Sequence, residues 1–249
     1  MRRLGELTWT EAEAARAASP IVLLPIGSTE AHGPHLPLAT DAILSDELAL
    51  RAAAALEADG RRTLIAPTLA YAITDYAAAF AGTISLSAAT ATALVSEVCA
   101  GLIGQGFARV CLVNSHLEPA HATSLREACE RVAAQTGGRV AFPDQLEKRW
   151  ARTLTDEYKR GACHAGSYET SLVLAARPEL VRDEVRKTLM VKPIDLARAM
   201  REGKRTFGEA GADQAYFGDP AAATVEEGND IYARLVTMIV TTVRELWPD

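Results

Sequence analysis

The feature that most constrains the fold is a regular alternation of short apolar segments with amphipathic helical segments. The apolar segments read as buried strands and occupy residues 21–26, 64–66, 110–114 and 140–142. Helical periodicity marks the segments between them, at residues 41–57, 87–103 and 119–135. This alternation favours parallel strands joined by right-handed helical crossovers. The sequence therefore predicts an α/β fold: a single-domain three-layer sandwich over residues 1–249, with a mostly parallel central sheet and helices on both faces.

The two ends of the chain carry further helix signals. A capping-box pattern, Thr10 to Glu13, predicts a first helix over residues 10–18, and a second such pattern, Thr224 to Glu227, introduces the final helix. Residues 169–176 also read as helical. Residues 183–222 show little periodicity, so we expect long connecting loops there around a short helix near 194–201.

Composition excludes several classes of protein. A formal net charge of −6 argues against nucleic acid or an anionic membrane as a partner. The apolar runs are too short to span a bilayer, and Arg2 and Arg3 are not followed by the apolar run of a signal peptide. The four cysteines form no C-x-x-C pair, so reduced thiols are expected. These features together predict a cytoplasmic protein.

Ligand-type side chains follow the strand predicted at 21–26. Glu30, His32, His35 and Asp41 stand within a dozen residues among glycines and prolines, which shape a loop rather than continue a strand. Loops at the carboxyl ends of parallel strands are where α/β proteins usually bind ligands. Imidazole nitrogens with carboxylate oxygens suit Zn²⁺ or Mn²⁺. The alternative is a polar surface loop.

A second and a third group of such side chains follow later in the chain. His116 and Glu118 come after the strand predicted at 110–114, at the same edge of the sheet, and with the first group they suffice for two metal ions that share a carboxylate. His116 alone could equally be a structural histidine. His164, in a loop, is a candidate general acid or base. Glu169 stands at a helix start, where a carboxylate is also favoured by the dipole alone.

These motifs resemble the creatininase (creatinine amidohydrolase) family. The resemblance rests on Gly27-Ser-Thr-Glu-x-His-Gly-Pro-His-Leu-Pro-Leu38, Asp41, Asn114-x-His-x-Glu118 and His164-Ala-Gly-x-x-Glu-Thr-Ser171, and covers roughly residues 20–230 in order. It implies an α/β domain with a parallel sheet, two divalent ions (Zn²⁺ and/or Mn²⁺) and a homo-oligomer built from dimers, such as a hexamer. It further implies one site of Glu30, Asp41 and His116, another of His32, Asp41 and Glu118, and His164 as proton shuttle.

The chain departs from the family where substrate contacts are expected. Thr74 and Tyr76 stand in a segment where many members have a Ser and a Glu-His pair, and the tryptophan that precedes His-Ala-Gly in the creatinine-acting branch is absent. Creatinine is therefore not the first choice. Candidates for substrate binding or for support of the ligands are Glu169, Tyr76, Thr74 and His35.

We therefore expect a dinuclear hydrolase of a carbon–nitrogen bond. The leading substrate is a small cyclic amide or a formamide, attacked by a hydroxide that Glu118 generates as base while His164 protonates the leaving nitrogen. Within the family, the alternatives are a peptidase and a deformylase of a nucleotide intermediate, although no phosphate loop is present. A different class of function is a metal-binding assembly module without catalysis.

Overall fold

The computed structural model describes residues 2–161 and 163–248 and contains a central sheet of four parallel strands. The order across the sheet is β2-β1-β3-β4, with a parallel register that aligns Ile21 with both Thr63 and Arg109. The strands are β1 (Ile21–Ile26), β2 (Thr63–Ile65), β3 (Arg109–Asn114) and β4 (Arg139–Ala141). The predicted parallel sheet is confirmed, with each strand boundary within one residue of the expected position.

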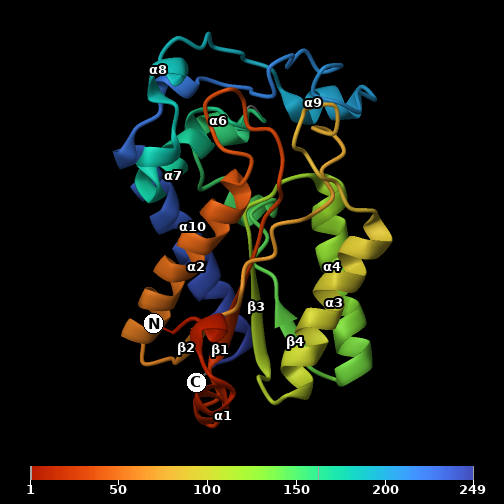
Figure 1. Cartoon of the computed structure of the whole chain (residues 1–249), viewed down its shortest axis with the longest axis vertical. Helices are drawn as coiled ribbons and strands as arrows, with labels where there is room; N and C mark the ends of the chain where they lie inside the picture. Colours follow the sequence, from red (N-terminus) through yellow and green to blue (C-terminus); the bar gives the residue numbers. More distant parts are fainter. Residues whose placement is uncertain (1, 162, 249) are drawn as a thin grey trace.

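Helices cover both faces of the sheet, as predicted (Figure 1). One face packs against α2 (Thr40–Ala58), α7 (Ser167–Ala176) and α10 (Val225–Leu246); the other packs against α3 (Ala88–Gly104) and α4 (Pro119–Thr136). Side chains of a strand alternate between its two faces. In β1, Ile21 and Leu23 accordingly enter the core beneath α2, whereas Val22 and Leu24 enter the core beneath α3 and α4. The two cores make the structure a three-layer sandwich.

The first helix begins earlier than predicted. The structure contains a short 3₁₀ turn (Leu4–Glu6) and then α1 (Trp9–Arg16), whose capping box is formed by Thr8 and Glu11. The Thr8 backbone is extended, its hydroxyl accepts from the Glu11 amide, and the Glu11 carboxylate accepts from the Thr8 amide. Thr10 already lies in the first turn, so the predicted box of Thr10 and Glu13 is wrong.

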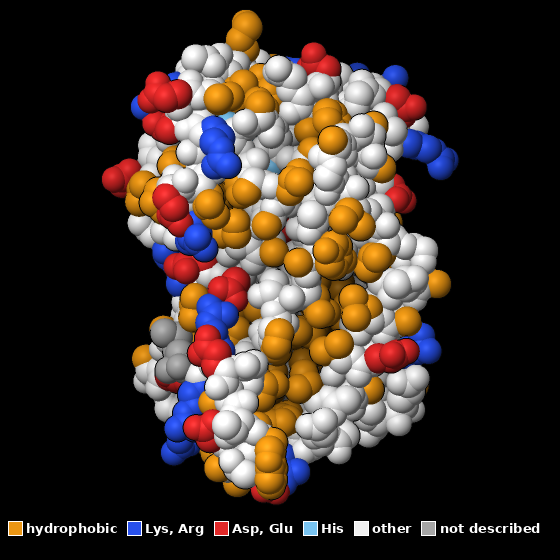
Figure 2. Space-filling view, in the orientation of Figure 1, with side chains coloured by type: hydrophobic (Ala, Val, Ile, Leu, Met, Phe, Trp, Pro, Cys, Tyr) orange, Lys and Arg blue, Asp and Glu red, His pale blue; other side chains and the backbone are white. Residues whose placement is uncertain are grey.

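Short elements lie above the carboxyl ends of the strands, at the top of Figure 1. They are α6 (Asp156–Lys159), α8 (Asp183–Arg186), α9 (Leu196–Arg201) and the 3₁₀ turns Pro178–Leu180 and Pro220–Ala222. The short helix α5 (Lys148–Ala151) lies instead beside α10, where Arg149 pairs with Glu245. The helix expected near 194–201 is confirmed as α9. Hydrophobic side chains gather in a band down the lower middle of the face in Figure 2. Within the described residues, no helix combines the length and the apolar character needed to cross a membrane.

Candidate metal centre

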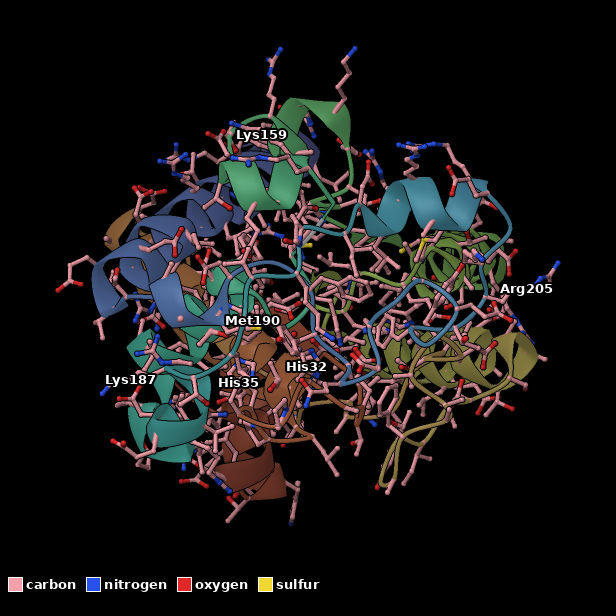
Figure 3. All side chains as sticks on the ribbon, turned by 90° about the horizontal axis from the view of Figure 1, so that it is seen from above. His32, His35, Lys159, Lys187, Met190 and Arg205 are labelled. Atoms are coloured by element: carbon pink, nitrogen blue, oxygen red, sulfur yellow. The ribbon has the colours of Figure 1, made fainter. Side chains whose placement is uncertain are left out.

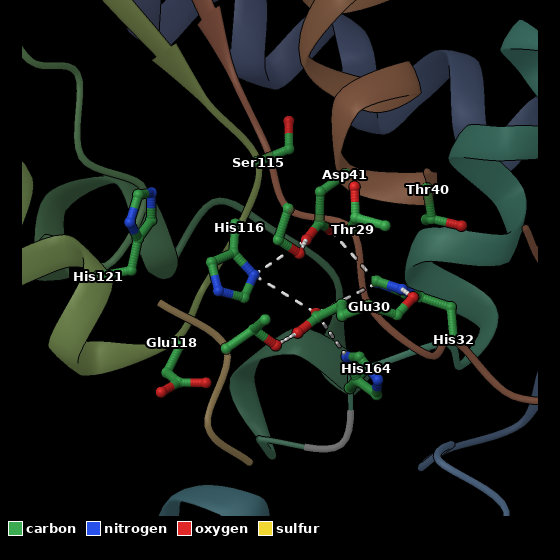
Figure 4. A network of polar contacts seen from close by, with 12 residues as sticks. Thr29, Glu30, His32, Thr40, Asp41, Ser115, His116, Glu118, His121 and His164 are labelled. Atoms are coloured by element: carbon green, nitrogen blue, oxygen red, sulfur yellow. Dashed lines mark hydrogen bonds and ion pairs between the residues drawn. The ribbon is translucent and has the colours of Figure 1, made fainter. Parts of the chain in front are cut away.

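Three loops meet at the carboxyl edge of the sheet and bring the candidate ligands together (Figure 4). The first loop leaves β1, the second leaves β3, and the third precedes α7. The first loop passes close to the start of α2, because a Cβ on Gly27 would lie 2.4 Å from the Ala42 nitrogen. Asp41, in the first turn of α2, is therefore directed into the same space as Glu30 and His32.

Asp41 lies between two groups of ligand atoms. Its Oδ2 is 2.9 Å from His116 Nδ1, and its Oδ1 is 3.3 Å from His32 Nε2. Glu30 Oε1 is 3.4 Å from His116 Nδ1, while Glu169 Oε2 is 3.5 Å from His32 Nε2. Glu30, Asp41 and His116 therefore form one group that could hold a metal ion, and His32, Asp41 and Glu169 form a second. A third group, Glu30, His32 and His164, overlaps both of them. A carboxylate with one oxygen towards each group is the shared ligand that a dinuclear centre needs.

The three histidines of the centre are each held by a backbone carbonyl. His32 Nδ1 lies 3.2 Å from the Glu30 oxygen, His116 Nε2 lies 2.7 Å from the Ile73 oxygen, and His164 Nε2 lies 3.0 Å from the Ala31 oxygen. A carbonyl can only accept, so each of these ring nitrogens donates. In the neutral ring, the other nitrogen then presents its lone pair to the carboxylates, which is the orientation that metal-binding histidines require.

The buried carboxylates of the centre carry negative charge that a metal cation would neutralise. Glu30, Asp41 and Glu169 are buried, and their ion pairs within the described residues are all to histidines. His32 Nε2 is fully buried and has no hydrogen-bond partner among these residues. Although burial opposes it, the charges of Asp41, Glu169 and Glu30 raise the pKa of His32 to about 10. A proton is thus held where a divalent ion would fit, and the donor set suits Zn²⁺ or Mn²⁺.

Glu118 lies beside the two groups but is in neither of them within the described part of the chain. Its carboxylate oxygens accept from the backbone amides of Asp75 at 3.2 Å and Tyr76 at 3.4 Å. Burial raises the pKa of Glu118 to about 7. The position of Glu169 therefore fits the second group better than that of Glu118, whose role as a ligand stays a prediction.

The other candidate residues lie around the ligands. Thr74 donates its hydroxyl to Glu30 Oε2. His35 is fully buried, and its Nε2 is 2.9 Å from the Thr170 hydroxyl, which places it behind the centre. Ser28, which had no predicted role, donates to Asp41 Oδ2 at 2.7 Å. Its position two residues before Glu30, in the loop that carries the ligands, is the only signal in the sequence.

A cavity of about 60 Å³ opens directly onto the centre. Its walls are largely apolar and include Tyr76, Leu117, Leu196, Met200 and Phe207. The ring centroids of His164 and Phe207 are 4.4 Å apart, so an aromatic side chain covers the histidine on the cavity side. Only traces of histidine are visible in the space-filling view (Figure 2). Water therefore has restricted access to the ligands.

Two ligand groups that share an aspartate, at the carboxyl edge of a parallel sheet, are consistent with a dinuclear metal site. Residues 5–243 match the family model for creatininase, creatinine amidohydrolase. The chain therefore belongs to the creatininase family and is a hydrolase.

Relatives within the family have different substrates. The chain is 33% identical to the mycofactocin precursor peptide peptidase of Mycobacterium ulcerans (strain Agy99), covering 98% of this chain and 93% of that protein. It is 31% identical to the creatinine amidohydrolase of Pseudomonas putida over 72% of this chain and 73% of that protein. A manganese form of creatininase superposes with a TM-score of 0.75 and 26% identity, covering 99% of both chains. A zinc–zinc form of a creatininase variant has a TM-score of 0.73 and 25% identity, covering 99% of this chain and 98% of that one.

Proposed function

We propose that this protein hydrolyses an amide bond in a short peptide, with two divalent ions held by Glu30, Asp41 and His116 and by His32, Asp41 and Glu169. The proposal rests on the position of Asp41, whose side chain presents one carboxylate oxygen to each ligand group. A peptide substrate is supported by similarity to a peptide peptidase over nearly the whole chain. The sequence favoured a small cyclic amide or a formamide over a peptide, and this similarity now favours the peptide.

The side chains around the centre can perform the proton transfers. Bound ions of this kind supply positive charge that polarises an amide carbonyl and lowers the pKa of water. Glu118, whose pKa burial raises to about 7, takes a proton from the attacking water. The water oxygen bonds to the carbonyl carbon, and the carbon–nitrogen bond then breaks. Glu118 then gives this proton up, and His164, with the lone pair of Nδ1 facing the carboxylates, takes it and relays it to the leaving nitrogen, so the products are a carboxylate and an amine.

The size of the cavity supports a second candidate. A volume of about 60 Å³ admits only a small group, which is compatible with a small cyclic amide as well as with the end of a peptide. Homo-oligomer formation stays a prediction.

The test is a panel of short peptides, cyclic amides and formamides, offered to protein loaded with Zn²⁺ or Mn²⁺ and assayed by amine release. Cleavage of peptides that depends on metal supports the proposal, with Glu118→Gln as the variant that keeps metal and loses turnover. Peptides left intact while a cyclic amide is cleaved would assign the second candidate. No metal-dependent release from any member of the panel would overturn amide hydrolysis.

A further inference from the structure

We infer that the substrate is anionic and that cations around the mouth of the cavity attract the charge on the part that stays outside. This inference rests on the proposed function and names the substrate class more closely: an acidic peptide with a small apolar group beside the scissile bond. The surface concerned is the cap segment, defined as residues 196–207, which comprises α9 and the turn that follows it.

The cap segment is basic in an acidic chain. It contains four cations, Arg198, Arg201, Lys204 and Arg205, and one carboxylate, Glu202, whereas the whole chain has a formal net charge of −6. Arg198 pairs with Glu202 at 2.8 Å. The side chains of Arg201, Lys204 and Arg205 are exposed and make no ion pair with any described residue.

The cap segment is also part of the cavity wall. Leu196, Met200 and Phe207 line the cavity, and two hydrogen bonds join the segment to Tyr76. The Tyr76 hydroxyl donates to the Lys204 oxygen at 3.1 Å, and the Phe207 amide donates to the Tyr76 oxygen at 2.9 Å. Three apolar side chains of the segment therefore line the cavity, and its backbone at Lys204 is bonded to Tyr76 in the cavity wall.

Arg205 lies at the periphery of the site and not on its floor. Seen from above, His32 lies near the middle of this end of the molecule and Arg205 lies at the edge on the side of α9 (Figure 3). The charge of Arg205 nevertheless acts on the cavity wall: burial, Glu118 and Glu209 raise the pKa of Tyr76, and Arg205 opposes that rise. Cations placed in this way raise the local concentration of an anionic substrate and speed its association by ~10-fold or more at low salt.

The test uses three peptides that share one apolar core and differ in the residues flanking it, which are two aspartates, two asparagines or two lysines. With metal-loaded protein, kcat/KM should be highest for the aspartate peptide and should fall with added salt, because the Debye length shortens from about 10 Å at 0.1 M to about 3 Å at 1 M. The order should reverse in the triple variant Arg201→Glu, Lys204→Glu, Arg205→Glu.

A matched control carries the same change of charge elsewhere. Arg62, Arg131 and Arg139 are exposed and lie towards the amino ends of the strands, so their triple replacement by Glu should leave the order of the peptides unchanged. A variant with Gln at positions 201, 204 and 205 should show a preference for the aspartate peptide that is weaker than that of the wild type. This variant still tests the inference if charge reversal prevents folding.

Binding measurements distinguish a failure of this inference from a failure of the proposed function. Fluorescence anisotropy with peptides carrying an uncharged dye measures charge preference whether or not a peptide is cleaved. Tighter binding of the aspartate peptide, lost in the cap variants and kept in the control, supports the inference even if hydrolysis fails. Equal binding and equal kcat/KM for the three peptides would overturn the inference while leaving amide hydrolysis in place. The inference would also be overturned if the control triple variant changed the order of the peptides as much as the cap variant does.

Discussion

Replacement of Ser28 by alanine tests whether Asp41 is the shared ligand. The Ser28 hydroxyl is fully buried and donates to Asp41 Oδ2 at 2.7 Å, the oxygen that also lies 2.9 Å from His116 Nδ1. A donor of this kind orients a ligating carboxylate and holds its charge. Its loss typically weakens metal binding ~10–100-fold, which is about 1.4–2.7 kcal/mol. Because Asp41 faces both groups, Ser28→Ala should weaken the binding of both ions.

The assay is competition with a chelator at neutral pH, followed by metal analysis per chain. Ser96→Ala is the matched control, because Ser96 is also a buried serine and donates to the Thr92 oxygen at 2.6 Å within α3, away from the ligands. That control should keep wild-type affinity for both ions. Unchanged affinity in Ser28→Ala, or a loss confined to one ion, would refute the idea that one carboxylate serves both sites.

Three further substitutions test the site and the stability of the fold. Asp41→Ala should lose both ions, and two ions per chain in this variant would contradict a bridging role. His164→Ala should keep the metal and lose turnover by ~10²–10⁴-fold, measured on whichever substrate the panel finds; loss of metal would instead make His164 a ligand. Burial lowers the pKa of His35 from 6.5 to about 4, so the unfolded chain takes up a proton that the native state excludes. Stability should therefore fall as pH drops from about 6.5 to 4, by roughly 2–3 kcal/mol, and urea unfolding of His35→Gln should show a shallower fall.

The sheet and its main helices could be predicted because their signals are local. The six apolar residues from Ile21 to Ile26 are all buried, as expected for a central strand covered on both faces. The short helices are different, since α5, α6 and α8 have four residues each and are too short to show periodicity. The cap segment forms part of the cavity only through distant contacts, such as the hydrogen bond between Tyr76 and Lys204.

The sequence predicted that ligand-type residues meet at one edge of the sheet, and the resemblance placed Glu118 with His32 and Asp41, where the structure has Glu169. The direction of Glu169 depends on where α7 begins, and tertiary contacts fix that point. The Glu157 carboxylate accepts from the amides of Tyr168 at 2.9 Å and Asp219 at 2.8 Å, and so joins the start of α7 to a segment fifty residues later.

Gly166 permits this arrangement, because a Cβ there would lie 2.4 Å from Glu157 Oε1 and 2.7 Å from the Phe217 oxygen. The close approach directs the first turn of α7 towards His32, and Glu169 Oε2 comes within 3.5 Å of its ring. In the sequence, Glu169 shows only the acidic first turn that the helix dipole would favour anyway. A contact between α6 and the start of α7 therefore directs Glu169 towards the second group, which the spacing of the motif did not indicate.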